Sequence, residues 1–151
     1  MTSLVYVLNG PNLNMLGVRE PEVYGRETLD DLRVRTEKAA ARNGLAVDFR
    51  QSNVEGEIVN WVQEARGKAK GIILNAGGYT HTSVAILDAL QAVSLPLVEV
   101  HLSNIFRRDE FRQHSYISLA ATGVICGLGA KGYELAIEAM ADILTKSTSK
   151  A

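Results

Sequence analysis

The protein has 151 residues, of which 46% are hydrophobic and 22% are charged, as in soluble globular proteins. Its net charge of −1 provides no basic field for nucleic acid, and no apolar run reaches the roughly 18 residues that a membrane span needs. The N-terminus lacks the basic region of a signal peptide, and Cys126 is the only cysteine, which fits a reducing cytoplasm. We therefore predict a cytoplasmic protein with a single domain over residues 1–151 and without nucleic-acid or membrane partners.

The first half of the chain predicts two strands and two helices. Leu4–Leu8 is an apolar run typical of a buried strand, and residues 9–25 follow it with little periodicity. Thr28 and Asp31 resemble a capping box that begins a helix, and Asn43–Gly44 ends it. Leu45–Arg50 is the second predicted strand. The second helix is predicted before Gly67 by an apolar stripe at Ile58, Val59, Val62 and Ala65.

The second half continues this alternation. The third strand is predicted at Gly71–Ala76, the fourth at Leu97–His101 and the fifth at Thr122–Leu128, with Cys126 as a small buried core residue. A last helix should run from about Gly132 to Lys146, followed by a polar tail that we expect to fray. Between the third and fourth strands, a helix is predicted before Pro96 by apolar residues at Val84, Leu87, Ala89, Leu90 and Val93.

This order of elements predicts an α/β protein of flavodoxin-like type, a three-layer sandwich with a five-stranded parallel sheet. Ligands bind such sheets beyond the carboxyl ends of the strands. The segments expected there hold all three histidines of the chain and several arginines, namely His81, His101, His114, Arg19, Arg107, Arg108 and Arg112. We therefore expect the functional site at this edge of the sheet.

The fourth strand ends in a carboxylate and an imidazole. Side chains alternate along a strand, so Glu99 and His101 share one side of it. A carboxylate at this distance can orient an imidazole and favour its charged form, which is how a general acid is built. The alternative is a structural histidine at a strand end, which forms its hydrogen bonds within the protein and has no catalytic role.

Two further segments at this edge suit the binding of an anion or a hydroxyl group. Gly77 and Gly78 let backbone N–H groups approach a ligand, although Thr80 or Thr82 could merely cap a helix there. Arg108 and Arg112 are four residues apart and would share one face of a helix, either to recognise a ligand or as a solvated surface.

The loop over residues 9–25 is long for a compact domain, and such loops are usually functional or disordered. It carries Arg19 and Tyr24. A tyrosine with the ordinary pKa near 10 is only about 0.1% ionised at pH 7, and a neighbouring guanidinium lowers that pKa. The alternative is a tyrosine that packs on apolar residues of the loop.

Other activities of this fold fit the sequence less well. Residues 127–132 match G-x-G-x-x-G, but no second βαβ half follows to supply an acid for a ribose, so we predict a tight turn. No spacing of histidines or cysteines indicates a metal site. The first strand leads into neither the acidic cluster of a phospho-acceptor domain nor the hydroxyl-rich loop of a flavin-binding protein.

Four segments together resemble the type II 3-dehydroquinate dehydratases, in the right order along nearly the whole chain. They are LNGPNLNMLGVREPEVYG (8–25), NAGGYTHTSVAILDA (75–89), EVHLSNIFRRDEFRQHSYIS (99–118) and GLGAKGYELA (127–136). The resemblance implies dehydration of 3-dehydroquinate to 3-dehydroshikimate in the shikimate pathway, through an enolate and with anti elimination. It also implies a flavodoxin-like fold, no metal or cofactor, and dodecamers built from trimers.

By position, the resemblance also implies the catalytic residues. Tyr24 would remove the C2 proton with its pKa lowered by Arg19, and Asn12 would hold a water that stabilises the enolate. His101 would protonate the departing C1 hydroxyl, with Glu99 as its orienting partner. The implied substrate-binding residues are Asn75, His81, Leu102, Ser103, Arg108 and Arg112, together with Asp88, which family trimers lend to the neighbouring subunit's site.

Few positions depart from the family pattern. Met15 stands where leucine is usual, Leu87 stands where arginine is common, and Arg107 replaces a small residue beside Arg108. Asp88 lies beside the apolar Leu87 and Leu90, which suits an interface better than solvent. The glycines and prolines of the opening loop suit a lid that moves. A non-catalytic assembly protein is the rival hypothesis, and the complete set of Tyr24, Arg19 and His101 argues against it.

Overall fold

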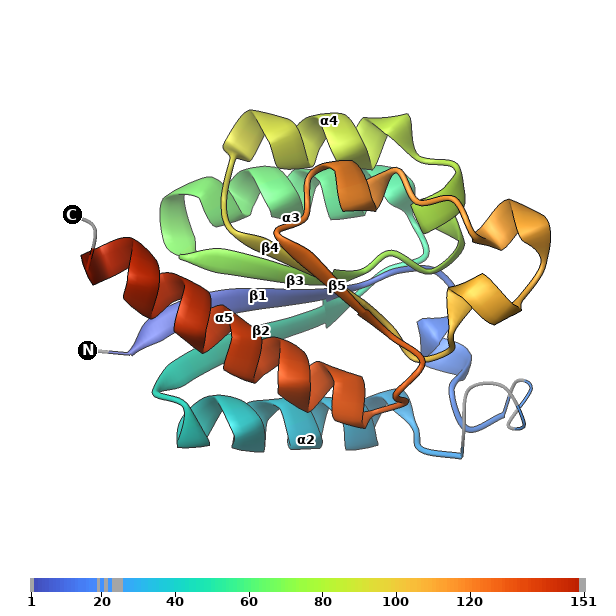
Figure 1. The fold of residues 1–151 in the computed structure, drawn as a ribbon, viewed down its shortest axis with the longest axis horizontal. Helices are drawn as coiled ribbons and strands as arrows, with labels where there is room; N and C mark the ends of the chain where they lie inside the picture. Colours follow the sequence, from blue (N-terminus) through green and yellow to red (C-terminus); the bar gives the residue numbers. More distant parts are fainter. Residues whose placement is uncertain (1, 19, 21, 23–25, 150–151) are drawn as a thin grey trace.

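The structure, a computed structural model, describes residues 2–18, 20, 22 and 26–149, with side chains to residue 147. A five-stranded parallel sheet forms its centre, in the order β2-β1-β3-β4-β5 (Figure 1). The strands are β1 (Ser3–Asn9), β2 (Leu45–Gln51), β3 (Gly71–Asn75), β4 (Leu97–His101) and β5 (Gly123–Cys126). This order is that of flavodoxin-like folds, so the predicted α/β fold class is confirmed.

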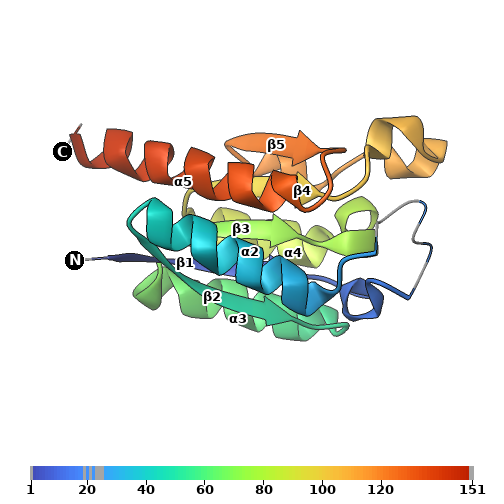
Figure 2. The same cartoon turned by 90° about the horizontal axis from the view of Figure 1, so that it is seen from below.

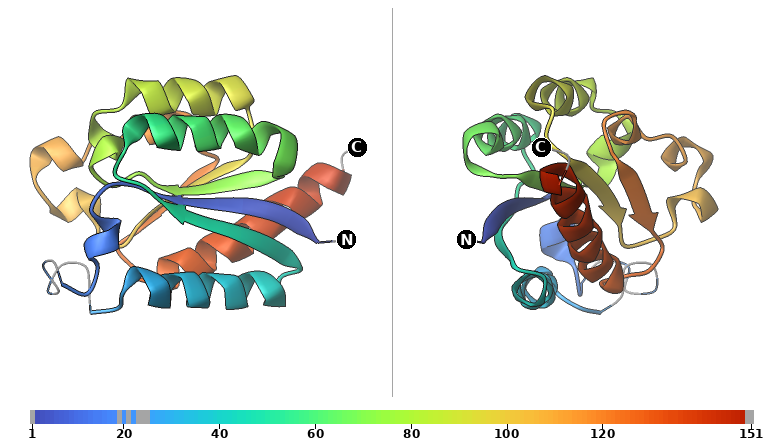
Figure 3. Two further views of the ribbon diagram at one scale, coloured as in Figure 1. Left: turned by 180° about the vertical axis from the view of Figure 1, so that it is seen from behind. Right: turned by 60° about the vertical axis from the view of Figure 1, so that its left-hand side comes forward.

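Helices cover both faces of the sheet. Figures 1 and 3 show α2 (Leu29–Arg42) and α5 (Lys131–Ser149) on one face, and α3 (Glu55–Lys68) and α4 (Val84–Val93) on the other. Alternation along β1 divides the core accordingly, because Val5 and Val7 pack beneath α2 and α5, whereas Tyr6 and Leu8 pack beneath α3 and α4. The molecule therefore has the three predicted layers.

The predicted helix signals agree with the structure at most ends. Thr28 Oγ1 accepts a hydrogen bond from Asp31 N, and Asp31 Oδ2 accepts one from Thr28 N, so the capping box is confirmed. Asn43 caps the other end of α2. Two helices are longer than predicted: α3 continues through Gly67 to Lys68, and α5 continues to Ser149, three residues beyond Lys146.

The fifth strand is less buried than its sequence predicts. It covers Gly123–Cys126 within the predicted Thr122–Leu128, and Val124 on it is 42% exposed. Cys126 is half-buried, so the prediction of a buried core cysteine was wrong. The physical reason is that β5 is an edge strand with β4 on one side. The following segment forms the predicted tight turn, with Gly127 at φ 90° and Gly129 at φ 61° before α5 begins.

The parallel register brings the carboxyl ends of the strands to one edge. Asn9 pairs with Gln51 on one side and with Asn75 on the other, and β4 ends beside β5 with His101 opposite Cys126. In Figure 2 the arrowheads of the strands point toward the loops at this end of the molecule. Within the described ranges, no helix is long and apolar enough to cross a membrane.

Candidate active site

A cavity of about 160 Å³ opens beyond the carboxyl ends of β1, β3 and β4. The loops after these three strands supply its walls. It brings together most of the predicted site residues, namely Asn12, Asn75, His81, His101, Leu102, Ser103, Arg108 and Arg112. The prediction that these residues share one edge of the sheet is therefore confirmed, whereas their chemical roles remain predictions.

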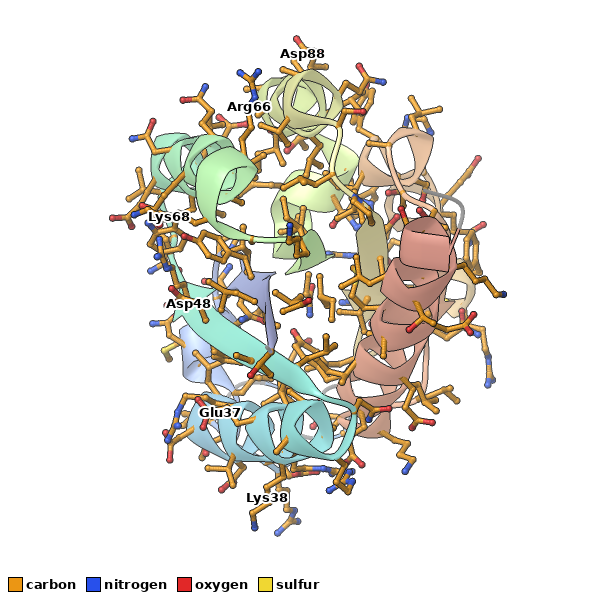
Figure 4. All side chains as sticks on the ribbon, turned by 90° about the vertical axis from the view of Figure 1, so that its left-hand side faces the viewer. Glu37, Lys38, Asp48, Arg66, Lys68 and Asp88 are labelled. Atoms are coloured by element: carbon orange, nitrogen blue, oxygen red, sulfur yellow. The ribbon has the colours of Figure 1, made fainter. Side chains whose placement is uncertain are left out.

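Of the four other predicted residues, Glu99 and Asp88 do not line this cavity, and Arg19 and Tyr24 lie outside the described residues. Glu99 is fully buried behind His101. Asp88 is exposed on the outer side of α4, at the top of Figure 4, and does not line this chain's own cavity.

The apolar residues beside Asp88 do not form the outward surface that the sequence suggested. Leu87 is 7% exposed and Leu90 is 4% exposed, because both side chains face the core beneath α4. Val84 is the half-exposed apolar residue of this helix. The expectation of an apolar interface at Leu87 and Leu90 was wrong, because neither leucine adds apolar surface beside Asp88.

His101 and Glu99 form a buried pair at the end of β4. His101 Nε2 donates a hydrogen bond of 2.5 Å to Glu99 Oε2, and both side chains are almost completely buried. The predicted sharing of one strand face is thereby confirmed. With one ring nitrogen bound to Glu99, the other nitrogen remains to exchange a proton with a ligand in the cavity.

Two serines complete the surroundings of Glu99. Ser115 Oγ donates to Glu99 Oε2 at 2.8 Å, and Ser118 Oγ donates to Glu99 Oε1 at 2.5 Å. Burial opposes ionisation of Glu99, but hydrogen bonds from His101, Ser118 and Ser115 outweigh it and hold the pKa of the carboxyl below its usual value. Glu99 is therefore an ionised acceptor that fixes the orientation of the His101 ring.

Sequence reasoning missed both serines. They stand three residues apart, and Ser118 N donates to Ser115 Oγ at 3.1 Å, a pattern that resembles ordinary turn capping. The only available signal was their place in the segment that carries the family resemblance, because their contact with Glu99 spans 16 and 19 residues of the chain.

His81 also lines the cavity, and its hydrogen bond fixes its tautomer. Its Nδ1–H donates to the backbone carbonyl of His114 at 2.7 Å, since a carbonyl can only accept. Burial lowers the pKa of His81, and the nearby His101 and Arg112 act in the same direction, whereas the His114 hydrogen bond acts against it. A neutral His81 presents Nε2 as an acceptor for a hydroxyl group.

The segment that carries the arginines forms two short turns rather than one helix. Ile105–Arg107 and Glu110–Arg112 are separate 3-10 turns, so the shared face that Arg108 and Arg112 would have on a helix does not arise, although both line the cavity. The Arg108 guanidinium lies 3.4 Å from Ser103 Oγ. Arg107 lines a larger adjoining cavity of about 500 Å³, between the loop after β4 and the starts of α2 and α5.

The loops after β1 and β3 are in close backbone contact. A Cβ atom at Gly10 would lie 2.3 Å from the Ala76 carbonyl oxygen, and one at Gly77, where φ is +59°, would lie 3.0 Å from the Pro11 carbonyl oxygen. The two glycines therefore allow these loops to pack directly on each other and fix one wall of the cavity. In the next turn, Ser83 caps α4 through Ile86 N, which corrects the expectation of capping by Thr80 or Thr82.

The sequence model of the family "Dehydroquinase class II" matches residues 3–141. The chain belongs to the class II dehydroquinase family. A protein of Caulobacter vibrioides named 3-dehydroquinate dehydratase is 58% identical over 139 residues, which cover 92% of this chain and 95% of that protein. One of Pseudomonas aeruginosa named 3-dehydroquinate dehydratase 2 is 56% identical over 142 residues, which cover 94% of this chain and 96% of that protein.

Solved structures agree with the class II dehydroquinase assignment. The crystal structure of a type II dehydroquinase from Propionibacterium acnes has a TM-score of 0.90 and 44% sequence identity, and covers 94% of this chain and 98% of that chain. The confirmed fold and family therefore rest on sequence and on structure alike. Among the described residues, no group of three or more histidine, cysteine, aspartate or glutamate side chains is placed to hold a metal ion.

Proposed function

We propose that this class II dehydroquinase dehydrates 3-dehydroquinate to 3-dehydroshikimate in the shikimate pathway, without a metal or cofactor. Its relatives of 56% and 58% identity bear the name of this activity. The structural observation that carries the proposal is the buried Glu99–His101 pair beside a cavity that Arg108 and Arg112 also line. Such a site suits a substrate with a carboxylate and a leaving hydroxyl group.

On the leaving-group side, His101 acts as the general acid. It gives its proton to the C1 hydroxyl as the C1–O bond breaks, so that the group leaves as water. Glu99 holds the ring in place and stabilises its charged form, and the hydrogen bonds from Ser115 and Ser118 keep Glu99 ionised. The electrons of the enolate then form the new double bond.

On the other side of the substrate, Tyr24 acts as the base. As a phenolate it removes the C2 proton, with its pKa lowered by Arg19, and the electrons of the C–H bond pass into the enolate. Asn12, which lines the cavity, holds the water that stabilises this enolate. We propose that residues 9–25 bring Tyr24 and Arg19 over the bound substrate and then move aside.

The remaining cavity residues bind the substrate. The Leu102–Ser103 segment and the arginines receive the carboxylate, because backbone N–H groups and guanidinium groups are strong donors to it. His81 accepts a hydrogen bond through Nε2, and Asn75 donates one to an oxygen substituent of the substrate. Together they hold the C2 proton toward the base and the C1 hydroxyl toward His101, as anti elimination requires.

We also propose that the protein acts in the cytoplasm as a dodecamer built from trimers, in which Asp88 serves the neighbouring subunit's site. Its exposure on the outer side of α4 leaves it available for this contact. Asp88→Ala should then weaken the trimer and lower activity together, as light scattering and an assay on one sample would show. Full activity in a stably monomeric variant would contradict the shared site.

The proposed reaction is tested by following the ultraviolet absorbance of the conjugated enone after addition of 3-dehydroquinate. We expect an absorbance rise for the wild-type protein and a near-complete loss of turnover, with substrate still bound, for Tyr24→Phe. A folded wild-type protein that gives no rise between pH 6 and 9 would refute the activity. A Tyr24→Phe variant that keeps a tenth of the wild-type kcat would remove Tyr24 as the base.

A further inference from the structure

A chain of hydrogen bonds through three buried side chains leads from β2 through the core to the cavity. Asn9 Nδ2 donates to the Arg50 backbone carbonyl at 2.9 Å, and the Tyr133 hydroxyl donates to Asn9 Oδ1 at 2.6 Å. Asn75 Nδ2 donates to the Tyr133 oxygen at 3.0 Å, and Gly77 N–H donates to Asn75 Oδ1 at 3.2 Å. Asn9, Tyr133 and Asn75 are all buried, and Asn75 is the member that lines the cavity.

Backbone groups at both ends give this chain one direction. The Arg50 carbonyl can only accept, so Asn9 directs its NH₂ group there and its oxygen toward Tyr133. The Tyr133 proton is then committed to Asn9, and its oxygen is left to accept from Asn75. At the other end Gly77 N–H can only donate, so it faces the Asn75 oxygen. If the Asn75 amide were flipped, its NH₂ group would face the Gly77 N–H group, and two donors cannot form a hydrogen bond.

The hydroxyl group of Tyr133 is costly to bury unless it is fully hydrogen-bonded. The side chain, on the first turn of α5, is completely buried in the core, and its ring is tilted against that of Phe49 with 6.4 Å between the ring centroids. A phenylalanine would fill the same space without desolvating a hydroxyl group. Burial also raises the pKa of Tyr133 above its usual value, so the group keeps its proton and its role as donor to Asn9.

The amide of Asn75 carries two N–H groups, and Tyr133 accepts one of them. Across residues 2–18, 20, 22 and 26–149, no protein acceptor takes the second N–H of Asn75. Asn75 therefore presents an N–H donor to the cavity rather than its carbonyl oxygen. Such a donor recognises an oxygen lone pair and disfavours a ligand that presents only an N–H or a methyl group there.

We propose that Tyr133 and Asn9 are positioning residues, which hold the Asn75 amide so that the cavity presents a hydrogen-bond donor to a substrate oxygen. This inference rests on the proposed function, because the oxygen belongs to 3-dehydroquinate. Neither residue touches the substrate, and both act through Asn75.

Tyr133→Phe tests the proposal because it keeps the ring and deletes the hydroxyl group. We expect kcat/KM to fall about tenfold, mostly through KM, because Asn75 binds the substrate in the ground state and the transition state alike. Tyr6→Phe is the matched control, since it also deletes the hydroxyl of a buried tyrosine, and this hydroxyl bonds Glu64 instead. It should keep kcat/KM within about twofold of wild type.

A double-mutant cycle with Asn75→Ala separates positioning from general destabilisation. If Tyr133 acts through Asn75, Tyr133→Phe should change kcat/KM less than about twofold once Asn75 is truncated. The same tenfold loss in both backgrounds would overturn the proposal, as would wild-type kcat/KM in a folded Tyr133→Phe variant. Asn9→Ala is the second variant if Tyr133→Phe does not fold, and its loss should likewise vanish in the Asn75→Ala background.

A measurement without substrate keeps this inference separate from the dehydratase activity. In ¹⁵N spectra the side-chain NH₂ of Asn75 should give one sharp pair of resonances in the wild type, and Tyr133→Phe should broaden it or speed its exchange with solvent. Unchanged resonances in a folded variant would overturn the positioning role even if the protein is an active dehydratase. An inactive wild type with the expected spectra would refute the proposed function and leave the positioning of Asn75 standing.

Discussion

Two carboxylates of this protein each accept a short hydrogen bond from a hydroxyl group, but the nitrogen groups that also bind them differ. Ser118 Oγ donates to Glu99 at 2.5 Å, and the Tyr6 hydroxyl donates to Glu64 at 2.5 Å. The nitrogen partner of Glu99 is the imidazole of His101, whereas Glu64 is paired with the Arg50 guanidinium at 2.6 Å. A guanidinium keeps its proton under all physiological conditions, but an imidazole can release it.

The two carboxylates also differ in location. Glu64, Tyr6, Arg50 and Asp48 form one cluster, the Glu64 cluster, which joins β1, β2 and α3 on the side of the molecule where Figure 4 labels Asp48. Glu99, His101, Ser115 and Ser118 form the other, the Glu99 cluster. The hydrogen bond from Arg50 is the main cause that lowers the pKa of Glu64 to about 2, and burial, followed by Glu64, raises the pKa of Tyr6 to about 12. This cluster is fixed in one protonation state and holds elements together. The Glu99 cluster borders a cavity and includes a group that can transfer a proton.

The largest effect is expected from His101→Asn, which removes the exchangeable proton from the Glu99 cluster. A positioned general acid contributes about 10²–10⁴-fold, so kcat should fall by about that factor while the protein remains folded. Enone absorbance measures the rate, and circular dichroism checks the fold. A loss smaller than fivefold would show that His101 is not the acid.

Ser118→Ala should have a smaller effect on the same cluster. It removes one donor from Glu99, which raises the pKa of the carboxyl, so activity should be lost at a higher pH on the acidic side of the pH–rate profile. We expect kcat at pH 7 to fall about tenfold, since a hydrogen bond to a charged group contributes roughly 1.5–3 kcal/mol. An unchanged acidic limb would argue that Ser118 does not maintain the ionised Glu99.

Tyr6→Phe makes the corresponding change in the other cluster, because it deletes the hydroxyl donor of Glu64. Loss of one hydrogen bond at the edge of the core should cost about 1 kcal/mol and lower Tm by about 2–4 °C. The rate of dehydration should stay at the wild-type value. If Tyr6→Phe lowered kcat as much as Ser118→Ala does, the functional distinction between the two clusters would be wrong.

The smallest effect concerns the acid stability that Glu64 provides. Its folded-state pKa of about 2 lies below the ordinary 4.5, so its contribution to stability is present above pH 4.5 and is lost as the pH falls toward 2. The Tm of wild type should therefore exceed that of Glu64→Gln at pH 7, and the difference should shrink between pH 4.5 and 2. Calorimetry at several pH values measures this, and a constant difference down to pH 2.5 would contradict it.

The fold was predictable because its signals are local. The capping box at Thr28 and Asp31 and the alternation that places Glu99 and His101 on one face each depend on residues within three positions of each other. The common edge of the loops followed from the parallel order of the strands alone. The family resemblance then placed Asn12, Asn75 and His81 in one site, and the structure brings them into one cavity.

What the sequence did not predict depends on contacts between distant residues. Ser115 and Ser118 reach Glu99 across a turn, and Tyr133 reaches Asn9 over 124 residues. No periodicity encodes such contacts. Apolar composition likewise does not distinguish an edge strand from a central one, which is why β5 was expected to be buried. The prediction that Leu87 and Leu90 face outward was wrong, because residues next to an exposed residue on a helix can still face the core.

The close contact between the loops after β1 and β3 decides where the specificity of this site can be changed. Any side chain at Gly10 would force the Ala76 backbone away, and one at Gly77 would be strained as well as crowded by Pro11. These two positions are therefore closed to redesign by substitution. The wall formed by residues 102–112 is lined by Leu102, Ser103, Ile105, Arg108 and Arg112, which lie on or beside two short turns. Libraries that seek a larger or differently charged substrate should begin there.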